Sequence, residues 1–490
     1  MNERPLVNET PALSEQEKNV IIGGVLLSML LAALDQTIVA PAMPTIGRAL
    51  GHPEYLPWVV TAYLLTATAM APLYGKLSDV YGRRPTIFGA IFIFLAGSLI
   101  SALAPSMAML ILGRAVQGLG GGGLFALSQT VIGDLVPPRE RARYAAWISG
   151  TWAVASIAGP LLGGTFAEHL HWSVIFWINL PLGLVALAII NNPLKKLPVH
   201  AREHSIDGVG ALLLIAATAI LLLALNWGGS RYPWLSPVIG GLIGCSACFW
   251  LLFALRVRRA AEPLISIEVL ANPVVRYGTL AMFLLQTSNV GLSVYLPVYA
   301  QSFNGLSASG SGVVMIGLLL GTVLGATTSG RTIPRFTHYK RLALAGCLLS
   351  GIGLTALAWL AGRTSLPVLE LLTMIVGFGT GLTFPVATIS VQNAVDQAHL
   401  GVATGLLTFL RSLGGALGVA LLGAIALGNG LPLGGEHVQA TATGALPALP
   451  FTYIFLACLV TTTLSLVLFH FMPEKPLRGR AENDVAPMVE

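Results

Sequence analysis

The chain has few charged residues. Only 10% of its 490 residues are Asp, Glu, Lys or Arg, against roughly 25% in soluble proteins. So few charges cannot cover a surface that faces water, while hydrophobic residues make up 55% of the chain. Most of the surface is therefore expected to face lipid, and the composition predicts an all-α polytopic membrane protein.

Cysteine is also scarce, and its placement excludes two kinds of site. The four cysteines lie in apolar runs, so no disulfide framework is predicted. Cys245 and Cys248 form a C-x-x-C pair, but no second pair or nearby histidine completes a zinc site. We expect this pair to serve helix packing. His169 and His171 lie in a predicted loop, and the other histidines are scattered along the chain. This distribution argues against a membrane-embedded enzyme, and we expect no metal and no cofactor.

Glycine, in contrast, is abundant. Gly118, Gly120 and Gly123 match the G-x-G-x-x-G spacing of a dinucleotide site. That site needs a preceding strand and an acid about 20 residues later, whereas here the glycines lie inside a long apolar run. Glycines in a membrane helix allow another backbone to approach closely. The stretch predicts a packing seam.

Long apolar runs recur along the whole chain. A helix that crosses a bilayer needs about 20 apolar residues, and fourteen segments qualify. They are 19–41, 57–76, 86–104, 107–131, 144–166, 172–191, 209–226, 236–255, 277–300, 308–329, 341–361, 366–390, 402–427 and 449–472.

The basic residues predict the orientation of these helices. Of the 27 Lys and Arg residues, 22 fall in the tails and loops on one side of the predicted membrane. The other side has Arg48, Arg231 and Arg363, and two more arginines lie within helices. Because cytoplasmic loops are rich in Lys and Arg, both termini are predicted to be cytoplasmic in a multi-pass protein of the cell membrane, and of the inner membrane if bacterial. This bias explains the basic pI without nucleic acid.

A weak internal repeat divides the chain. GKLSDVYGRRP (75–85) corresponds to GRTIPRFTHYKR (330–341), and DLVPPRERARYAAWISG (134–150) corresponds to NAVDQAHLGVATGLLTF (393–409). We predict two pseudo-symmetric six-helix bundles, 19–191 and 277–472, and a linker, 192–276, with two inserted central helices at 209–226 and 236–255. Short tails, 1–18 and 473–490, complete the chain. Such repeats are typical of transporters with a substrate site between the halves.

Asp35 is the one acid placed well inside a predicted span. A carboxylate in lipid usually faces the bundle interior or a water-filled cavity and has a function, so we expect Asp35 to exchange protons. The alternative is a structural hydrogen-bonding residue. Arg114 lies at a similar depth, near 10 Å at about 1.5 Å per residue, and is a better partner than Arg411. Alternatively, each arginine bonds only backbone carbonyls.

At these residues the sequence resembles a known family. LDQTIVAPAMP, GKLSDVYGRRP, RAVQGLGGGG and SIAGPLLGG follow the motif order of the major facilitator superfamily. IDGVGALLL, AEPLISIEVL, GFGTGLTFP and FLRSLGGALG look like its fourteen-helix drug:proton antiporter branch. The resemblance covers residues 20 to 472 and implies an exporter that works by alternating access and is driven by protons.

The resemblance also implies roles for individual residues. Asp35 and Arg114 match the proton-coupling pair of the family. A cytoplasmic conformational latch matches Gly75, Asp79, Gly82, Arg83 and Arg84, and the antiporter motif matches Gly159, Pro160, Gly163 and Gly164. The family usually has a basic residue after the latch aspartate, but Val80 follows Asp79 here. The alternatives are a solvated turn for Asp79 and Arg83, and simple tight packing for the glycines.

Polar and aromatic residues at helical spacing suggest a cavity for the substrate. Core packing or hydrogen bonds between helices would explain them equally well. The candidates are Gln286, Asn289, Tyr295, Tyr299, Phe378, Thr380, Thr383, Phe384 and Arg411. Because Asp35 is the one acid placed deep in a span, we expect small lipophilic substrates that are neutral or monocationic. We also expect the protein to be a monomer that exports them in exchange for protons. A second hypothesis is the export of a lipid or neutral metabolite, with Asp35 coupling protons without contacting the substrate.

Overall fold

The computed structural model describes residues 14–51, 55–196, 207–229, 231–260, 262–304, 306, 314–336, 338–429 and 448–477. The regular structure of these residues is helical, with one isolated bridge between Gly228 and Tyr232. A helix satisfies its backbone hydrogen bonds within itself, which is what an apolar segment needs in lipid. The all-helical fold class is therefore confirmed for the described residues.

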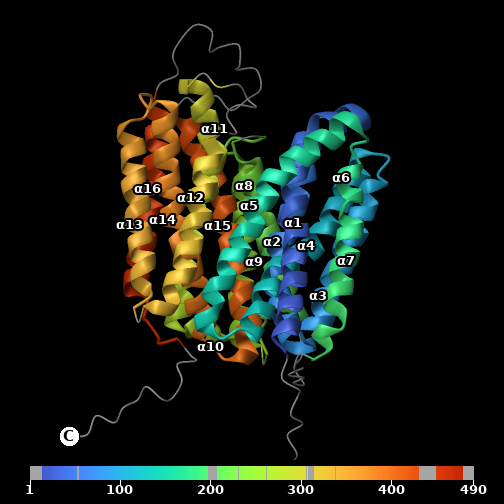
Figure 1. Ribbon diagram of the computed structural model, residues 1–490. Helices are drawn as coiled ribbons and strands as arrows, with labels where there is room; N and C mark the ends of the chain where they lie inside the picture. Colours follow the sequence, from blue (N-terminus) through green and yellow to red (C-terminus); the bar gives the residue numbers. More distant parts are fainter. Residues whose placement is uncertain are drawn as a thin grey trace, which may run out of the picture.

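The helices form two bundles and an inserted pair (Figure 1). The N-terminal bundle contains α1 (Glu15–Leu50), α2 (Leu56–Tyr81), α3 (Arg83–Ala102), α4 (Met107–Leu135), α5 (Pro138–His169), α6 (Val174–Trp177) and α7 (Asn179–Asn191), with the short η2 (Pro193–Lys196). The inserted pair is α8 (Gly208–Trp227) and α9 (Pro237–Arg259). The short α10 (Ile267–Ala271) precedes the C-terminal bundle, which contains α11 (Pro273–Asn304), α12 (Val314–Thr332), η4 (Ile333–Arg335), α13 (Lys340–Trp359), α14 (Leu366–Asn393), η5 (Gln397–His399), α15 (Leu400–Gly428) and α16 (Leu449–Phe471).

Twelve helices in the described part of the chain are long and apolar enough to cross a membrane. Helices α2 and α5, with 26 and 32 residues, are not among them. Helix α2 packs against α4 and α15, and α5 packs against α1 and α12. Both helices are nevertheless longer than the roughly 20 residues that a bilayer crossing needs.

The predicted span 172–191 is divided into two helices. Helix α6 ends at Trp177 and α7 begins at Asn179, with Ile178 between them. Pro181, which has no backbone donor, lies in the first turn of α7, where a helix tolerates proline. The side chain of Asn179, the first residue of α7, is buried in the protein interior.

The internal repeat is visible in matched contacts. The hydroxyl of Thr37 in α1 donates to the carbonyl oxygen of Ala155 in α5 at 2.8 Å. The hydroxyl of Thr287 in α11 donates to the carbonyl oxygen of Gly414 in α15 at 3.0 Å. Each half therefore has the same crossing between its first and fifth long helices.

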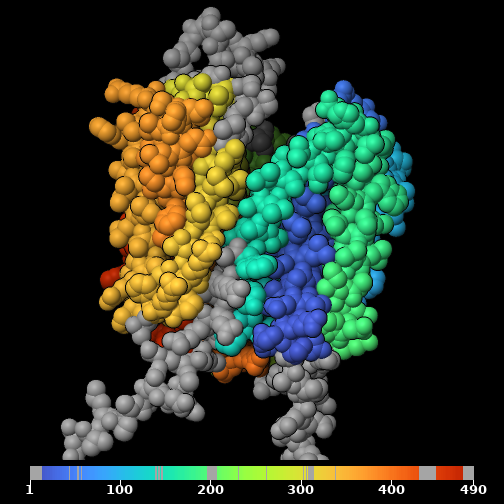
Figure 2. All heavy atoms as spheres, viewed as in Figure 1, coloured from blue at the N-terminus to red at the C-terminus, as the bar shows by residue number. Residues whose placement is uncertain are grey.

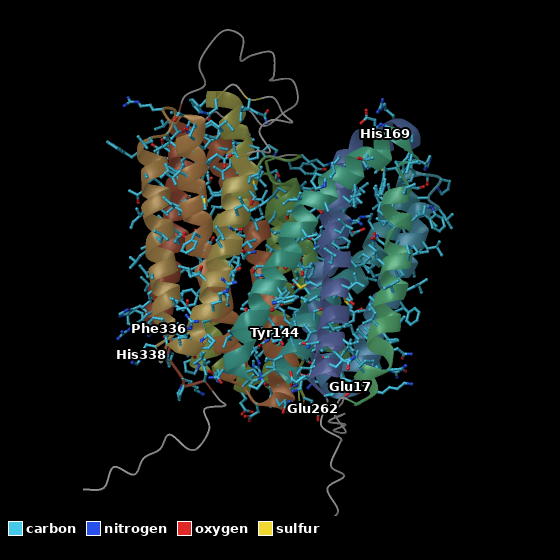
Figure 3. All side chains as sticks on the ribbon, in the orientation of Figure 1. Glu17, Tyr144, His169, Glu262, Phe336 and His338 are labelled. Carbon is cyan, nitrogen blue, oxygen red and sulfur yellow. The ribbon has the colours of Figure 1, made fainter. Side chains whose placement is uncertain are left out.

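The two bundles meet at one end of the molecule, which we call the lower end from its place in Figure 1. Helix α1 begins and α16 ends there. Glu17, Glu262 and His338 lie at this end, whereas His169, in the last turn of α5, lies at the upper end (Figure 3). Helix α12 lies against α5 in the lower part of the front face, and the two surfaces diverge upward (Figure 2).

The inserted pair packs beside both bundles. Helix α8 contacts α2 of one bundle and α15 of the other. The carboxylate of Asp207, before α8, accepts a hydrogen bond from Arg256 of α9 at 3.0 Å and ties the pair together. Helix α9 is mostly exposed, and so are Cys245 and Cys248. The expectation that these two cysteines pack between helices is wrong, because the face of α9 that carries them points away from the bundles.

The glycines of α4 form the predicted packing seam. A Cβ atom added at Gly118 would collide with the carbonyl oxygen of Tyr63 in α2, and one added at Gly122 would collide with that of Ala67. A Cβ at Gly120 would meet the carbonyl oxygen of Ala90 in α3. The missing side chains allow α2 and α3 to approach α4 on two faces, which confirms the seam.

Candidate functional site

Asp35 and Arg114 form an ion pair inside the N-terminal bundle. Arg114 Nη1 lies 2.5 Å from Asp35 Oδ2. The exposed fractions of the two side chains are 0% and 1%. Arg114 Nε also donates to the carbonyl oxygen of Val59 in α2 at 3.0 Å. The pairing expected from their similar depths is confirmed, and a buried ion pair of this kind is tolerated only with further hydrogen bonds.

Two amides complete the hydrogen bonds of the carboxylate. Gln117 Nε2 donates to Asp35 Oδ1 at 2.6 Å, and Asn179 Nδ2 donates to the same oxygen at 3.0 Å. Both amides also donate to Ser98 Oγ in α3, at 2.8 and 3.2 Å. Gln117, Asn179 and Ser98 are fully buried. Asp35 thus accepts three donors from two helices other than its own.

The sequence interpretation missed these polar partners. Gln117 follows Arg114 by three residues on the same helix, so its position on the same face could have revealed it. Ser98 and Asn179 are distant in sequence, and no local pattern links either of them to Asp35.

Aromatic rings cover the arginine. The Arg114 guanidinium lies 4.4 Å from the centre of the Tyr63 ring and 5.7 Å from that of Phe176. Faces of aromatic rings attract cations, most strongly where water is excluded. The rings from α2 and α6 therefore stabilise the cation while leaving its donors to Asp35 and Gln117.

Asp79 joins the two bundles at the lower end. Its two carboxylate oxygens accept hydrogen bonds from the backbone N–H groups of Gly401, at 3.0 Å, and Val402, at 2.8 Å. These amides belong to the first turn of α15, where N–H groups lack partners within the helix and the helix dipole favours a negative charge. The carboxylate of one half therefore caps a helix of the other half. Gly75 permits the approach, because a Cβ there would collide with the carbonyl oxygen of Gly401.

Arg83 links this cap to a second acid. Its guanidinium lies 2.5 Å from Asp79 and 2.6 Å from Asp134 at the end of α4. The Asp134 contact was not predicted, since the two residues are 51 positions apart in sequence. Gly82 turns the chain between α2 and α3 with φ of 89°, a conformation that favours glycine.

The other latch predictions are modified by the structure. Asp79 lies in the last turn of α2 and Arg83 begins α3, so the predicted loop between them is a single glycine. Arg84 does not reach the other bundle. Its guanidinium donates to Asn191 Oδ1 at 2.7 Å and lies over the Phe88 ring, which fastens α3 to α7.

A second contact between the bundles lies nearby. Gln392 of α14 donates to the carbonyl oxygen of Gln129 in α4 at 3.4 Å. Gln392 also accepts a hydrogen bond from Arg141 of α5 at 3.5 Å. Like the Asp79 cap, these contacts are at the lower end, so they help to hold this end closed.

The predicted antiporter motif lies inside α5, which continues to His169. A Cβ at Gly159 would collide with the Thr37 hydroxyl, and one at Gly163 would collide with the carbonyl oxygen of Ile38. Pro160 is exposed, and Gly164 has open space around it. Two of the four motif residues thus bring α5 close to α1 just above Asp35.

Two of the predicted cavity residues belong to the core. Tyr299 is fully buried, its hydroxyl lies 2.6 Å from Thr364 Oγ1, and its ring packs against Phe303, Phe451 and Phe455. Tyr295 is 5% exposed and lies in the same apolar cluster. Both rings fill space between α11 and its neighbours, which contradicts a cavity-lining role in this conformation.

The structure explains the positions of some of the other predicted cavity residues. Thr380 and Thr383 are buried and bond to carbonyl oxygens of their own helix, Phe384 packs against the core, and Phe378 is partly buried. Gln286, Asn289 and Arg411 are partly exposed. Gln286 Oε1 and Asn289 Nδ2 are buried atoms without a partner in the described residues. Among the described residues, no cluster of His, Cys, Asp and Glu is arranged to hold a metal.

Comparison with known proteins identifies the family. Residues 25–419 match the family model of the Major Facilitator Superfamily. The chain belongs to this superfamily. It is 34% identical over 418 residues to Multidrug resistance protein 3 of Bacillus subtilis (strain 168), covering 85% of this chain and 81% of that protein. It is also 32% identical over 411 residues to Multidrug transporter protein MdtP of the same organism, covering 84% and 76%.

Solved structures share the fold of this superfamily member. The proton:xylose symporter XylE, bound to 6-bromo-6-deoxy-D-glucose, matches with a TM-score of 0.63 at 15% identity, covering 95% of this chain and 98% of that one. At this identity the likeness concerns the fold alone. Family and relatives together make this protein a membrane-embedded major facilitator transporter.

Proposed function

We propose that the protein is a proton-coupled antiporter that exports neutral or monocationic lipophilic compounds by alternating access. The observation that carries this proposal is the fully buried pair of Asp35 and Arg114, because an ionisable pair in a span marks a proton or ion pathway. Two Bacillus subtilis relatives are named Multidrug resistance protein 3 and Multidrug transporter protein MdtP, which supports lipophilic compounds as the substrate class.

The proposal includes the membrane topology. We infer fourteen spanning helices, with α2 and α5 added to the twelve apolar helices. The lower end is assigned to the cytoplasm because the basic loops around Lys76 and Arg256 lie there. The closure of the bundles at this end by Asp79 supports an outward-facing conformation. We further propose that the protein works as a monomer in the cell membrane, and in the inner membrane if bacterial.

The cycle follows from the two sites. A proton that reaches Asp35 from outside neutralises the carboxylate and removes the charge that Arg114, Gln117 and Asn179 stabilise. The bundles then rearrange, the Asp79 cap on α15 breaks, and the proton leaves to the cytoplasm. No cofactor takes part, since the proton gradient supplies the driving force.

The second hypothesis, export of a lipid or neutral metabolite, remains open. It is favoured by one observation, the complete burial of Asp35, since a carboxylate that no solvent reaches can couple protons without contacting the substrate.

Proton release on substrate binding tests the coupling. We expect ethidium added to the purified transporter in weakly buffered detergent solution to release protons, and Asp35→Asn to abolish both this release and ethidium efflux driven by a pH gradient. Glu370→Gln is the matched control, because Glu370 is a partly buried acid of the C-terminal bundle. Wild-type efflux by the Asp35→Asn protein would refute the role of Asp35.

A further inference from the structure

Asn179 holds the carboxylate of Asp35 in an arrangement that suits only its ionised form. An ionised carboxylate can accept hydrogen bonds but cannot donate one. The amide nitrogen of Asn179 faces Asp35 Oδ1 at 3.0 Å and Ser98 Oγ at 3.2 Å. Its amide oxygen, Oδ1, is buried and has no donor among the described residues. The reverse orientation would direct an oxygen at a negative charge.

Protonation of Asp35 creates a donor that needs an acceptor. Gln117 Oε1 already accepts from Arg114 Nη1 at 2.7 Å. Ser98 Oγ already accepts from two amides and donates to the carbonyl oxygen of Phe94 at 3.0 Å. The oxygen of Asn179 is the unused acceptor within this network. A half-turn of the terminal torsion, which has a broad and roughly two-fold profile, exchanges the oxygen and the nitrogen.

We propose that Asn179 is a proton-dependent amide switch, which donates to ionised Asp35 and turns over to accept from protonated Asp35. The proposal rests on the proton coupling proposed above and adds a positioning residue to it. In the ionised state the group without a partner is the amide oxygen. After the turn it is the amide nitrogen, whose two N–H groups have left Asp35 Oδ1 and Ser98 Oγ. A buried N–H without a partner is rarer in proteins than a buried oxygen without one.

Protonation therefore makes this packing less favourable and favours one in which α7 moves. Asn179 is the first residue of α7 and contacts α1 and α3. One turn along α7, Gly183 packs closely on Leu95 of α3, where an added Cβ would lie 2.6 Å from Leu95 Cδ2. A change at Asn179 is thus passed directly to the contact between α7 and α3.

The charged and titratable groups around Asp35 are few. Arg114 faces it from α4, and Tyr63 of α2 lies against that arginine. The sequences of α6 and α7 contain no ionisable residue, and those of α3 and α5 have charged residues only near their ends. A pH-dependent change in the Asn179 amide would accordingly report protonation of Asp35.

Infrared difference spectra of the full-length protein between high and low pH test the switch. We expect a protonated-carboxyl band that Asp35→Asn removes. We also expect a change in a side-chain amide band that Asn179→Leu removes and the matched Asn289→Leu keeps. Asn179→Leu should shift the carboxyl band and lower proton-driven ethidium efflux about tenfold, as expected for one hydrogen bond to a charged group, with unchanged ethidium binding.

The outcomes separate the two proposals. A carboxyl band from Asp35 without any change in the Asn179 amide would overturn the switch and leave the proton coupling intact. Absence of the Asp35 band would overturn both. If Asn179→Leu does not fold, wild-type protein with asparagine isotopically labelled at the side-chain carbonyl gives the same reading, because the labelled band must respond to pH together with the Asp35 band.

Discussion

At the crossing of α1 with α5, Thr37 donates to Ala155, and at the crossing of α11 with α15, Thr287 donates to Gly414. Two residues before Thr37 is Asp35, whereas two residues before Thr287 is Leu285. Both are 0% exposed. The same helix crossing is thus built around an acid in one half and an apolar side chain in the other.

The lower end shows a similar difference. The turn GKLSDVYGRRP places Asp79 against α15, while the corresponding turn GRTIPRFTHYKR has Pro334 where the aspartate would be. Proline has neither a charge nor a donor to offer a neighbouring helix. The N-terminal bundle therefore contains both the ion pair and the latch, and the C-terminal bundle supplies the backbone that the latch holds.

The largest difference should appear when one arginine is removed from each half. Arg114→Ala leaves the Asp35 carboxylate buried without a cation, and breaking a buried pair costs about 3–5 kcal/mol. Arg411→Ala should change stability by less than about 1 kcal/mol, because no ion pair or hydrogen bond of Arg411 is found in the described residues. Thermal unfolding in detergent measures both.

The pH dependence of this loss has a definite sign. Without Arg114, an ionised Asp35 is an uncompensated charge in the protein interior, which costs more free energy than a neutral carboxyl group there. Stability of Arg114→Ala should therefore be highest at low pH and fall as pH rises. A loss that is equal at all pH values would mean that Arg114 does not compensate Asp35.

The latch should give a smaller effect, mainly on conformation. Asp79→Asn removes the negative charge at the N-terminus of α15, worth about 0.3–1 kcal/mol, and should favour opening of the lower end. Spin labels at Leu103 and Trp359, exposed residues at the upper ends of α3 and α13, should then report shorter distances. Asp134→Asn keeps the cap and is the control. Unchanged distances together with weakened ethidium binding would contradict a latch.

The matched threonines should give the smallest effect and the sharpest comparison. Thr37→Val and Thr287→Val each remove one hydrogen bond between helices and should each cost about 0.5–1.5 kcal/mol. Only Thr37→Val should also displace the pH optimum of efflux, because only α1 contains an acid. Equal pH profiles for both variants would show that the crossing does not position Asp35.

Features that depend on the surrounding solvent or on the internal repeat could be predicted from the sequence alone. Long apolar runs predicted the helices, and equal depth predicted that Asp35 meets Arg114. Other contacts between residues on different helices of a bundle could not be predicted from the sequence. Asn179 reaches Asp35 from a helix that is distant from α1 in sequence, and Tyr299 is buried because four aromatic rings cluster at the upper end. Both depend on three-dimensional packing that no local pattern encodes.

The complete enclosure of Asp35 has an energetic consequence for the cell. Each charge that crosses a membrane at 100 mV dissipates about 2.3 kcal/mol. If Asp35 were open to water on both sides, an idle carrier would act as a short circuit for protons. In this structure 0% of the Asp35 side chain is exposed and its oxygens are held by three donors, so under the proposed coupling water has no path to it at rest. We infer that a proton enters from outside only when this enclosure opens toward that side, which keeps the two ends of its path from being open together.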